Sequence, residues 1–421
     1  MDLVFHIGCE KTGTTSVQSW FDANDAILRD HGIWYAQAFG RANNRGIMFY
    51  GLLPGTSDDQ LRNTGIETEE QHIALQARIA QEFAADIAAA REAGARTYVI
   101  SNEHCQSRLK THEMVQRTHD LLAPHFDRME IHCFVRPQID MSLSLASTLS
   151  RNRNIVDRDW IDRDMNPNFP YYRFDLLLRR WADVYGQDTI FPVSFRAQRD
   201  SVGYFQSRLG LDAVQLDRQP VVNAALDYRT ITLINALVRA GYGERKLDYA
   251  SRIFVNDLPI EQRLTLDRAT AMRLQQRFDT VNQELIAAFP QLATEDLTPD
   301  WSKYPETGNI ERIHEADNVG DMLCAMIDRI RAETCFEKAR RLAMQSERES
   351  RANRPDTSLS AAREALRYAT LASEAAAYAK QSRGIIARME RRIARWERNL
   401  GKRAAYPEPG PSPDMAEEPI D

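Results

Sequence analysis

The sequence predicts an α/β fold, with a parallel sheet flanked by helices and a helical region after it. Three observations lead to this prediction. Short apolar runs alternate with helical patterns through the first half of the chain, and the first run, residues 3–8, ends in glycine. From about Tyr204 onward the pattern is mostly helical and contains no clear strand. Alternation of strands and helices is typical of a parallel sheet that carries helices on both faces.

Four strands are expected in the first half of the chain. They cover residues 3–8, 97–100, 129–135 and 189–193, which are rich in apolar and β-branched side chains. One helix is expected over residues 14–28, where apolar side chains recur at helical spacing, and a longer one over 69–92, which Gly94 ends. The strand ends therefore alternate with helix starts, as a parallel sheet requires.

Composition narrows the class of protein. The 421 residues, 43% of them apolar, suffice for one large domain with an appendage. A formal net charge of -6 argues against nucleic acid as the main partner. The five cysteines form no C-x-x-C pair and no metal-ligand spacing, which indicates a reducing compartment. No secretory signal and no membrane-spanning run is visible, so a cytoplasmic location is expected.

Three segments are expected: a ligand-binding domain over residues 1–300, a helical extension over 301–403, and a disordered tail, rich in proline and acidic residues, over 404–421. A polar break at 353–357 precedes a long helix over 358–400. Apolar side chains in this helix repeat at 3-4-3-4 spacing, with arginines around them: Ile386, Met389, Ile393, Trp396 and Leu400. The plain interpretation is packing on its own domain, and the alternatives are self-association, a partner helix or an anionic membrane surface.

The most informative segment lies at the junction of the first strand and the first helix. Residues 8–16 read Gly-Cys-Glu-Lys-Thr-Gly-Thr-Thr-Ser. Gly8 and Gly13 have the spacing of a phosphate-binding loop, G-x-x-x-x-G-K-[ST]. Thr14 occupies the position of the usual lysine, and the only cation of the loop is Lys11. This displacement favours an anionic group other than a magnesium-bound triphosphate.

A strand, a glycine-framed turn and a helix N-terminus together make a cradle for an anion. The first amides of a helix have no intrahelical partner, and the helix dipole adds partial positive charge. Lys11 adds a full charge, and four hydroxyl groups add donors: Thr12, Thr14, Thr15 and Ser16. A polar strand–helix turn without a ligand is the alternative, but the coincidence of these residues at one junction favours anion binding.

This loop resembles the 5′-phosphosulfate loop of sulfotransferases that use 3′-phosphoadenosine 5′-phosphosulfate (PAPS). It is especially similar to the K-T-G-T-T-S form of bacterial sulfotransferase-like proteins. Weaker similarities lie at residues 176–186, 195–211 and 222–226, so that the resemblance covers about residues 1–290. It implies a P-loop NTPase-like fold and sulfotransferase activity with PAPS as co-substrate. No metal is expected, because the magnesium-binding triphosphate motif is absent and Lys11 neutralises the leaving group.

The resemblance also implies a binding pair for the 3′-phosphate, an arginine at a strand end and a serine eight residues later. Arg136 ends the third expected strand, and Ser144 follows at that distance, while Ser142 fits the spacing less well. The carboxyl ends of parallel strands form the edge where such sheets bind ligands. Eight residues are about two helical turns, which returns Ser144 toward the same phosphate. The alternative is an exposed arginine beside an unrelated helix-surface serine.

Sulfuryl transfer also needs a base that removes the proton of the acceptor hydroxyl. Glu103 follows the second expected strand, on the same sheet edge as Lys11 and Arg136. Carbohydrate sulfotransferases use a glutamate after such a strand, whereas small-molecule sulfotransferases use histidine, so His104 is a rival for this role. A carboxylate that caps the following helix is the structural alternative for Glu103.

The resemblance and the glutamate together favour a hydroxyl of a glycan or glycoconjugate as acceptor. Two polar segments, residues 39–48 and 151–164, are candidates for acceptor contacts, although solvated surface loops are the plainer interpretation of both. Two other functions stay open: a nucleotide kinase or triphosphatase with a degenerate loop, and an interaction protein built on a sulfotransferase core.

Overall fold

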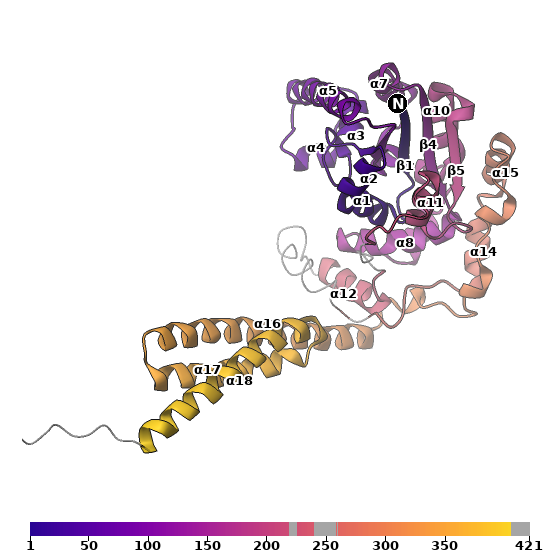
Figure 1. The fold of residues 1–421 in the computed structure, drawn as a ribbon. Coiled ribbons are helices and arrows are strands. Elements are labelled where there is room, and N and C mark those ends of the chain that lie inside the picture. Colours follow the sequence, from indigo (N-terminus) through magenta and orange to yellow (C-terminus); the bar gives the residue numbers. More distant parts are fainter. Residues whose placement is uncertain (219–224, 240–257, 259, 406–421) are drawn as a thin grey trace, which may run out of the picture. The chain divides into compact units, whose positions relative to one another are not determined.

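The computed structural model describes residues 1–218, 225–239, 258 and 260–405, and Figure 1 shows its elements. Its centre is a five-stranded sheet in the order β2-β3-β1-β4-β5, and every strand pair is parallel. The strands are β1 (Asp2–Gly8), β2 (Ile33–Tyr35), β3 (Thr97–Ser101), β4 (Arg128–Val135) and β5 (Ile190–Ser194). The predicted α/β fold with a parallel sheet is therefore confirmed, and its four predicted strands are β1, β3, β4 and β5.

Helices follow each strand and lie around the sheet. Among the described residues up to 314 they are α1 (Thr14–Ala23), α2 (Asp25–Asp30), α3 (Arg45–Gly51), α4 (Asp59–Asn63), α5 (Glu69–Glu92), α6 (His104–Arg108), α7 (His112–Leu122), α8 (Gln138–Arg151), α9 (Arg158–Asp164), α10 (Phe174–Tyr185), α11 (Ser201–Arg208), α12 (Tyr228–Arg239), α14 (Arg268–Gln276) and α15 (Asp279–Ala288). The expected helix over 69–92 has these bounds in the structure, because a Thr68 capping box fixes its start.

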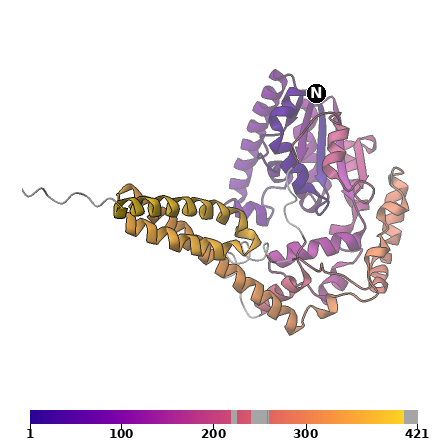
Figure 2. The ribbon, with the colours of Figure 1, turned by 60° about the horizontal axis from the view of Figure 1, so that its bottom comes forward.

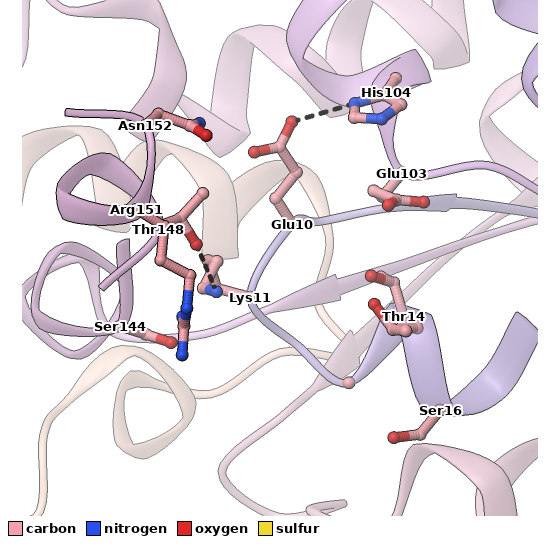
Figure 3. Close-up of a pocket in the computed structure, with 12 residues that line it drawn as sticks. Glu10, Lys11, Thr14, Ser16, Glu103, His104, Ser144, Thr148, Arg151 and Asn152 are labelled. Atoms are coloured by element: carbon pink, nitrogen blue, oxygen red, sulfur yellow. Dashed lines mark hydrogen bonds and ion pairs between the residues drawn. The ribbon is translucent and has the colours of Figure 1, made fainter. Parts of the chain in front are cut away.

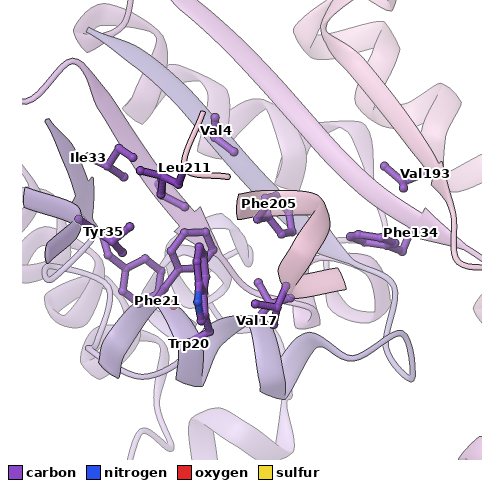
Figure 4. Close-up of a cluster of buried hydrophobic side chains, with 13 residues drawn as sticks. Val4, Val17, Trp20, Phe21, Ile33, Tyr35, Phe134, Val193, Phe205 and Leu211 are labelled. Carbon is purple, nitrogen blue, oxygen red and sulfur yellow. The ribbon is translucent and has the colours of Figure 1, made fainter. Parts of the chain in front are cut away.

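Alternate side chains of the strands pack against helices on opposite faces of the sheet. On one face, Val4 of β1 and Phe134 of β4 join α1 and α11 in an apolar cluster that Figure 4 shows. On the other face, the ring of Phe5 lies 5.4 Å from that of Trp181 of α10, edge to face. Both faces of the sheet are therefore covered, and ligands of such sheets bind at the carboxyl ends of the strands.

The chain turns in opposite directions after two neighbouring strands. From β1 it passes through α1 toward β2, whereas from β4 it passes through α8 toward β5, on the other side of the sheet. Such a reversal opens a crevice between the carboxyl ends of the two strands. The loop after β1 and the start of α8 therefore lie at the place where open α/β sheets bind ligands.

The helix expected over residues 14–28 is wrong as a single element. The structure has α1 and α2 with Asn24 between them, and the Asn24 side chain explains the break. Its Nδ2 donates to the carbonyl oxygens of Trp20 (2.8 Å) and Asp217 (2.9 Å), and its Oδ1 accepts from the Asp217 amide (2.9 Å). These bonds to a distant segment replace the continuation of the helix.

The described residues up to 239 and from 260 to 314 form one compact unit, and residues 315–405 form a second. The division falls after residue 314 rather than after 300, where the sequence places it. Residues between these positions are bonded to the first unit: Tyr304 donates to Asp140 (2.6 Å), and Asn309 donates to the Arg263 carbonyl (2.9 Å). The expected tail falls mostly on residues 406–421, which lie outside the described residues.

The second unit contains three helices, α16 (Ala316–Arg351), α17 (Pro355–Ser373) and α18 (Ala376–Ala405), which Figure 2 shows from another side. The single helix expected over 358–400 is wrong, because the chain turns at Glu374 and Ala375. The turn lets Tyr378 stack on Phe336 of α16, with ring centroids 5.0 Å apart. The apolar stripe of α18 packs within this unit, where Met389 is fully buried among alanines of α16 and α17. The side chain of Leu400 lies outside the described residues.

Candidate functional site

The loop between β1 and α1 owes its path to residues with unusual backbone angles. Gly8 has a φ of 113° and Gly13 a φ of 82°, which glycine adopts without strain. A Cβ on Gly8 would also meet the Glu103 backbone at 3.3 Å. Lys11 takes the left-handed conformation (φ 66°), rare for a residue with a side chain. The loop therefore makes a tight turn against the end of β3.

One cavity of about 410 Å³ opens over this loop, and Figure 3 shows its lining. Its residues come from the loop, the start of α1, the residues after β3, and α8 with the residue that follows it. They are Glu10, Lys11, Gly13, Thr14, Thr15, Ser16, Glu103, His104, Ser144, Thr148, Arg151 and Asn152. The structure thus brings eight of the ten predicted site residues to one cavity.

The start of α1 faces this cavity with free donor groups. Gly13 occupies the N-cap position, and no side chain caps the helix there. The first amides of α1 are therefore available to an anion, together with the hydroxyl groups of Thr14, Thr15 and Ser16. Thr12 lies apart from them: it is buried, and its hydroxyl donates to the Cys9 carbonyl (2.6 Å), so it stabilises the loop instead of lining the cavity.

The ammonium group of Lys11 is the cation of the loop. Its Nζ donates to the Thr148 hydroxyl of α8 (2.9 Å), as Figure 3 shows. Burial lowers the pKa of Lys11, and the nearby positive charge of Arg151 lowers it further. A half-buried ammonium beside a second cation interacts strongly with an anion, because few water molecules screen it.

Glu103 and His104 lie side by side after β3, and both are half-buried. Glu103 occupies the N-cap position of α6, but its carboxylate makes no capping hydrogen bond. One of its oxygens accepts instead from the side-chain amide of Gln18 of α1. The capping role proposed as the alternative for Glu103 is thus not seen, and the carboxylate lines the cavity.

Glu10 is a cavity residue that the sequence analysis did not select. One carboxylate oxygen accepts from the Ser107 hydroxyl (2.7 Å) and lies 3.5 Å from Nδ1 of His104, and the other accepts from the Tyr171 hydroxyl (3.0 Å). Burial by itself opposes ionisation, but the nearby His104 and the hydrogen bonds of Ser107 and Tyr171 leave the pKa of Glu10 below its usual value. In the sequence, only the position of Glu10 inside the loop indicated that it could line the cavity.

Arg136 and Ser144 face different cavities. Ser144 lines the first cavity one helical turn before Thr148, whereas its competitor Ser142 is fully buried. Arg136 donates to the Lys11 carbonyl (2.7 Å) and lines a neighbouring cavity of about 310 Å³. Binding of one phosphate by both residues therefore stays a prediction.

The cavity at Arg136 is rich in positive charge. Its lining combines five basic and two acidic side chains with Pro137 and Phe195: Arg136, Arg196, Arg199, Arg263, Lys303, Asp140 and Asp300. The guanidinium of Arg136 lies over the ring of Phe195, and its Nε is buried without a hydrogen-bond partner. Burial lowers the pKa of Arg136, although arginine keeps its charge. An unpaired buried donor in a basic cavity fits an anionic ligand.

The two segments considered for acceptor contacts have different surroundings. In residues 39–48, Arg41 pairs with Asp22 (2.7 Å), and the buried Asn44 side chain donates to the Ala36 carbonyl (2.9 Å), so both are used within the fold. In residues 151–164, Arg151 and Asn152 line the first cavity. The histidines inside the strands are core residues: His6 bonds Ser101 (2.9 Å), and His132 bonds Tyr204 (2.9 Å).

Comparison with known proteins gives one similarity. No protein-family model and no curated protein matches the chain. Among solved structures, a sulfotransferase from Alicyclobacillus acidocaldarius is similar, with a TM-score of 0.33 and 16% sequence identity over 59% of this chain and 98% of that chain.

Two absences concern the part of the chain that the structure describes. Within it, no helix is long and apolar enough to cross a membrane. Within it too, no three His, Cys, Asp or Glu side chains gather closely enough to hold a metal ion. Four cysteines are free thiols, Cys9, Cys105, Cys133 and Cys335, and the side chain of Cys324 lies outside the described residues.

Proposed function

We propose that the protein is a PAPS-dependent sulfotransferase that transfers the sulfuryl group to a hydroxyl of a glycan or glycoconjugate. One observation carries the proposal. A single cavity combines the uncapped start of α1, the ammonium group of Lys11 and two candidate bases, Glu103 and His104. An anion-binding helix start beside a proton acceptor is what the transfer of an anionic group to a hydroxyl requires.

The two neighbouring cavities fit the two anionic ends of PAPS. The first amides of α1, with the hydroxyls of Thr14 to Ser16, suit the 5′-phosphosulfate. Arg136 contacts the Lys11 carbonyl from the second cavity, so the two sites are joined at the loop. The unpaired Nε of Arg136, with Arg196 and Arg199, suits the 3′-phosphate.

The residues of the first cavity can then share the work of an in-line transfer. When bound, PAPS supplies a sulfuryl group whose sulfur–oxygen bond to the 5′-phosphate breaks during transfer. Glu103 or His104 accepts the proton of the acceptor hydroxyl while the hydroxyl oxygen bonds to sulfur. Lys11 stabilises the negative charge that remains on the 5′-phosphate oxygen.

A titration with nucleotides tests the donor. Adenosine 3′,5′-bisphosphate (PAP), the product of transfer, should bind more tightly than ATP with magnesium, because Thr14 stands where a triphosphate loop has lysine. Arg136→Ala should remove the preference for PAP over 5′-AMP, which lacks the 3′-phosphate. Tighter binding of ATP would favour the kinase or triphosphatase and would contradict the proposal.

A screen with radiolabelled PAPS tests the acceptor. Oligosaccharides and lipid-linked sugars are offered in turn, and transfer of label to at least one of them is expected. Asn152 and Thr148 line the cavity with amide and hydroxyl groups, which suit the hydroxyls of a sugar. Binding of PAP without transfer to any acceptor would favour an interaction protein on a sulfotransferase core.

A further inference from the structure

The carboxylate of Glu10 is held in place by residues of other elements. Its carboxylate points from the phosphate-binding loop toward His104, as Figure 3 shows, and lies 3.5 Å from His104 Nδ1. Three groups from other elements fix it: the hydroxyls of Ser107 and Tyr171 donate to its oxygens, and its backbone amide donates to Gln106 (2.8 Å). The carboxylate therefore has a defined position and a defined partner.

The charge of Glu10 is stabilised in this position. Burial opposes ionisation, but the contacts with His104, Ser107 and Tyr171 hold the pKa of Glu10 below its usual value, so the residue is an anion at neutral pH. His104 Nδ1 is buried and has no hydrogen-bond partner, and the half-buried Glu10 carboxylate 3.5 Å away is placed to attract its hydrogen. The other nitrogen then keeps a free electron pair. For His104 the nearer nitrogen is Nδ1, so the free electron pair lies on Nε2.

We propose that Glu10 is a positioning residue that holds His104 in the Nδ1–H tautomer, so that Nε2 is the base of the reaction. The inference rests on the proposed function and chooses between the two candidate bases. In other proton-transfer sites, too, a carboxylate orients an imidazole that takes the proton of a hydroxyl. Here the carboxylate, Glu10, belongs to the phosphate-binding loop.

In the proposed step, the proton of the acceptor hydroxyl moves to His104. The acceptor O–H bond breaks, its proton passes to Nε2 of His104, and its oxygen bonds to sulfur. The bond between sulfur and the 5′-phosphate oxygen breaks, and the electron pair stays on that oxygen beside Lys11. Glu10 keeps its charge throughout and stabilises the imidazolium that forms.

Glu103 has a different environment from His104. One oxygen of its carboxylate accepts from the Gln18 side-chain amide, and no hydrogen bond or ion pair joins it to a titratable group in the described part of the chain. The charged groups that line the cavity with His104 are Glu10, Glu103, Lys11 and Arg151, and Tyr171 contacts it through Glu10. Among these, Glu10 is the group that lies within ion-pair distance of the ring.

Nitrogen NMR of the protein without donor or acceptor tests the position of His104. Neutral histidines labelled with ¹⁵N report which ring nitrogen carries hydrogen, and His104→Gln assigns the signal. In the wild type, His104 should be the Nδ1–H tautomer. In Glu10→Gln it should become a mixture of tautomers, whereas the matched change Glu103→Gln should leave it unchanged. A wild-type Nε2–H tautomer, or no effect of Glu10→Gln, would overturn the proposal.

Kinetics test whether this position serves the reaction. His104→Gln should lower kcat by about 10²-fold or more, the usual contribution of a general base. Glu10→Gln should lower kcat by about 10-fold, as loss of an orienting partner does, with less change in KM for PAPS. In the double variant, Glu10→Gln should have little further effect, because it acts through His104.

The outcomes separate this proposal from the proposed function. If Glu10→Gln lowered kcat equally in the wild type and in His104→Gln, Glu10 would act elsewhere. If Glu103→Gln were inactive and His104→Gln active, Glu103 would be the base. Either result overturns the role of Glu10 while sulfuryl transfer stands. Absence of transfer by the wild type would instead overturn the proposed function, and the tautomer measurement would still decide whether Glu10 orients His104.

Discussion

Lys11 combines a displaced position in the sequence with a rare backbone conformation. In the left-handed region, its side chain leaves the loop toward α8 and reaches Thr148, instead of lying at the start of α1 as a triphosphate-loop lysine does. The displaced lysine thus faces the same cavity as Glu103 and His104. In the proposed transfer, an ammonium group at this place would stabilise the leaving oxygen, which becomes negative.

Replacement of this ammonium group should slow transfer strongly. For Lys11→Ala we expect kcat to fall by about 10²–10³-fold, the usual effect of removing one group that stabilises a developing negative charge. Steady-state kinetics with PAPS and an accepted sugar measure the loss. Lys110→Ala, which removes an exposed lysine outside the cavity, is the control and should be as active as wild type. A wild-type kcat in Lys11→Ala would exclude this role.

Acid should destabilise the first unit through His6. Burial, and then the nearby His132, lower the pKa of His6 to about 3, whereas an unfolded histidine has the usual value of 6.5. Between these values the unfolded chain binds the proton and the folded chain does not, so folding stability falls as pH falls. The free energy of unfolding should decline from pH 6.5 toward pH 3, by at most about 1.4 kcal/mol per pH unit for this group.

The matched variant for this experiment is His6→Asn, which keeps a polar side chain but does not titrate. Its chemical unfolding, followed at several pH values, should depend less on pH over the same range than that of the wild type. His132 titrates too, with a pKa that burial also lowers, so part of the slope should persist in the variant. Equal slopes in the two proteins would show that His6 is not protonated on unfolding in this range.

At the scale of single residues, the sequence predicted those residues of the candidate cavity that lie close together along the chain. Lys11 and Thr14 to Ser16 follow one glycine frame, and Glu103 follows a recognisable strand. Glu10 and Thr148 were not selected, because their roles come from contacts with residues 97 and 137 positions away. The separation of Arg136 and Ser144 into two cavities also depends on how the third strand and α8 lie in space.

At the scale of elements, strong local patterns were predicted well and interruptions were not. The strands β1, β3, β4 and β5 are apolar runs bounded by polar residues, and the start of α5 is fixed by a capping box. The short strand β2 has three residues and no alternation, so its pairing with β3 is needed to define it. The turn at Glu374 lies in an alanine-rich run without glycine or proline, and packing of Tyr378 on Phe336 sets its place.

The break between α1 and α2 gives an element-scale prediction. Asn24 is buried and makes three hydrogen bonds to the backbone of Trp20 and Asp217. Asn24→Ala would remove these three hydrogen bonds, each of which contributes about 0.5–1.5 kcal/mol. We expect a loss of about 2–4 kcal/mol in the free energy of unfolding, measured with urea. The exposed Asn63→Ala is the control, and equal stabilities of the two variants would contradict this account.

At the scale of the whole molecule, the two compact units have cores of different composition. The cluster on one face of the sheet contains aromatic rings such as Trp20, Phe21 and Phe205. The core of the three-helix unit contains five alanines with Ile385 and Met389. Small side chains let helices approach closely, so this unit depends on close packing rather than on large buried side chains. Since all residues of both cavities belong to the first unit, ligand binding should not depend on the alanine core.

A single substitution in the alanine core tests this independence in the full chain. Ala365 is fully buried on α17, and Ala365→Leu adds three carbon atoms to a packed interior, which costs about 1–3 kcal/mol. Hydrogen exchange should become faster in α16, α17 and α18 and should stay the same in the five strands, because local stability follows the unit that is perturbed. The affinity for PAP should equal that of wild type. Ala377→Leu, on the exposed side of α18, is the control. Faster exchange in the strands, or weaker PAP binding in Ala365→Leu alone, would mean that the two units fold as one cooperative body.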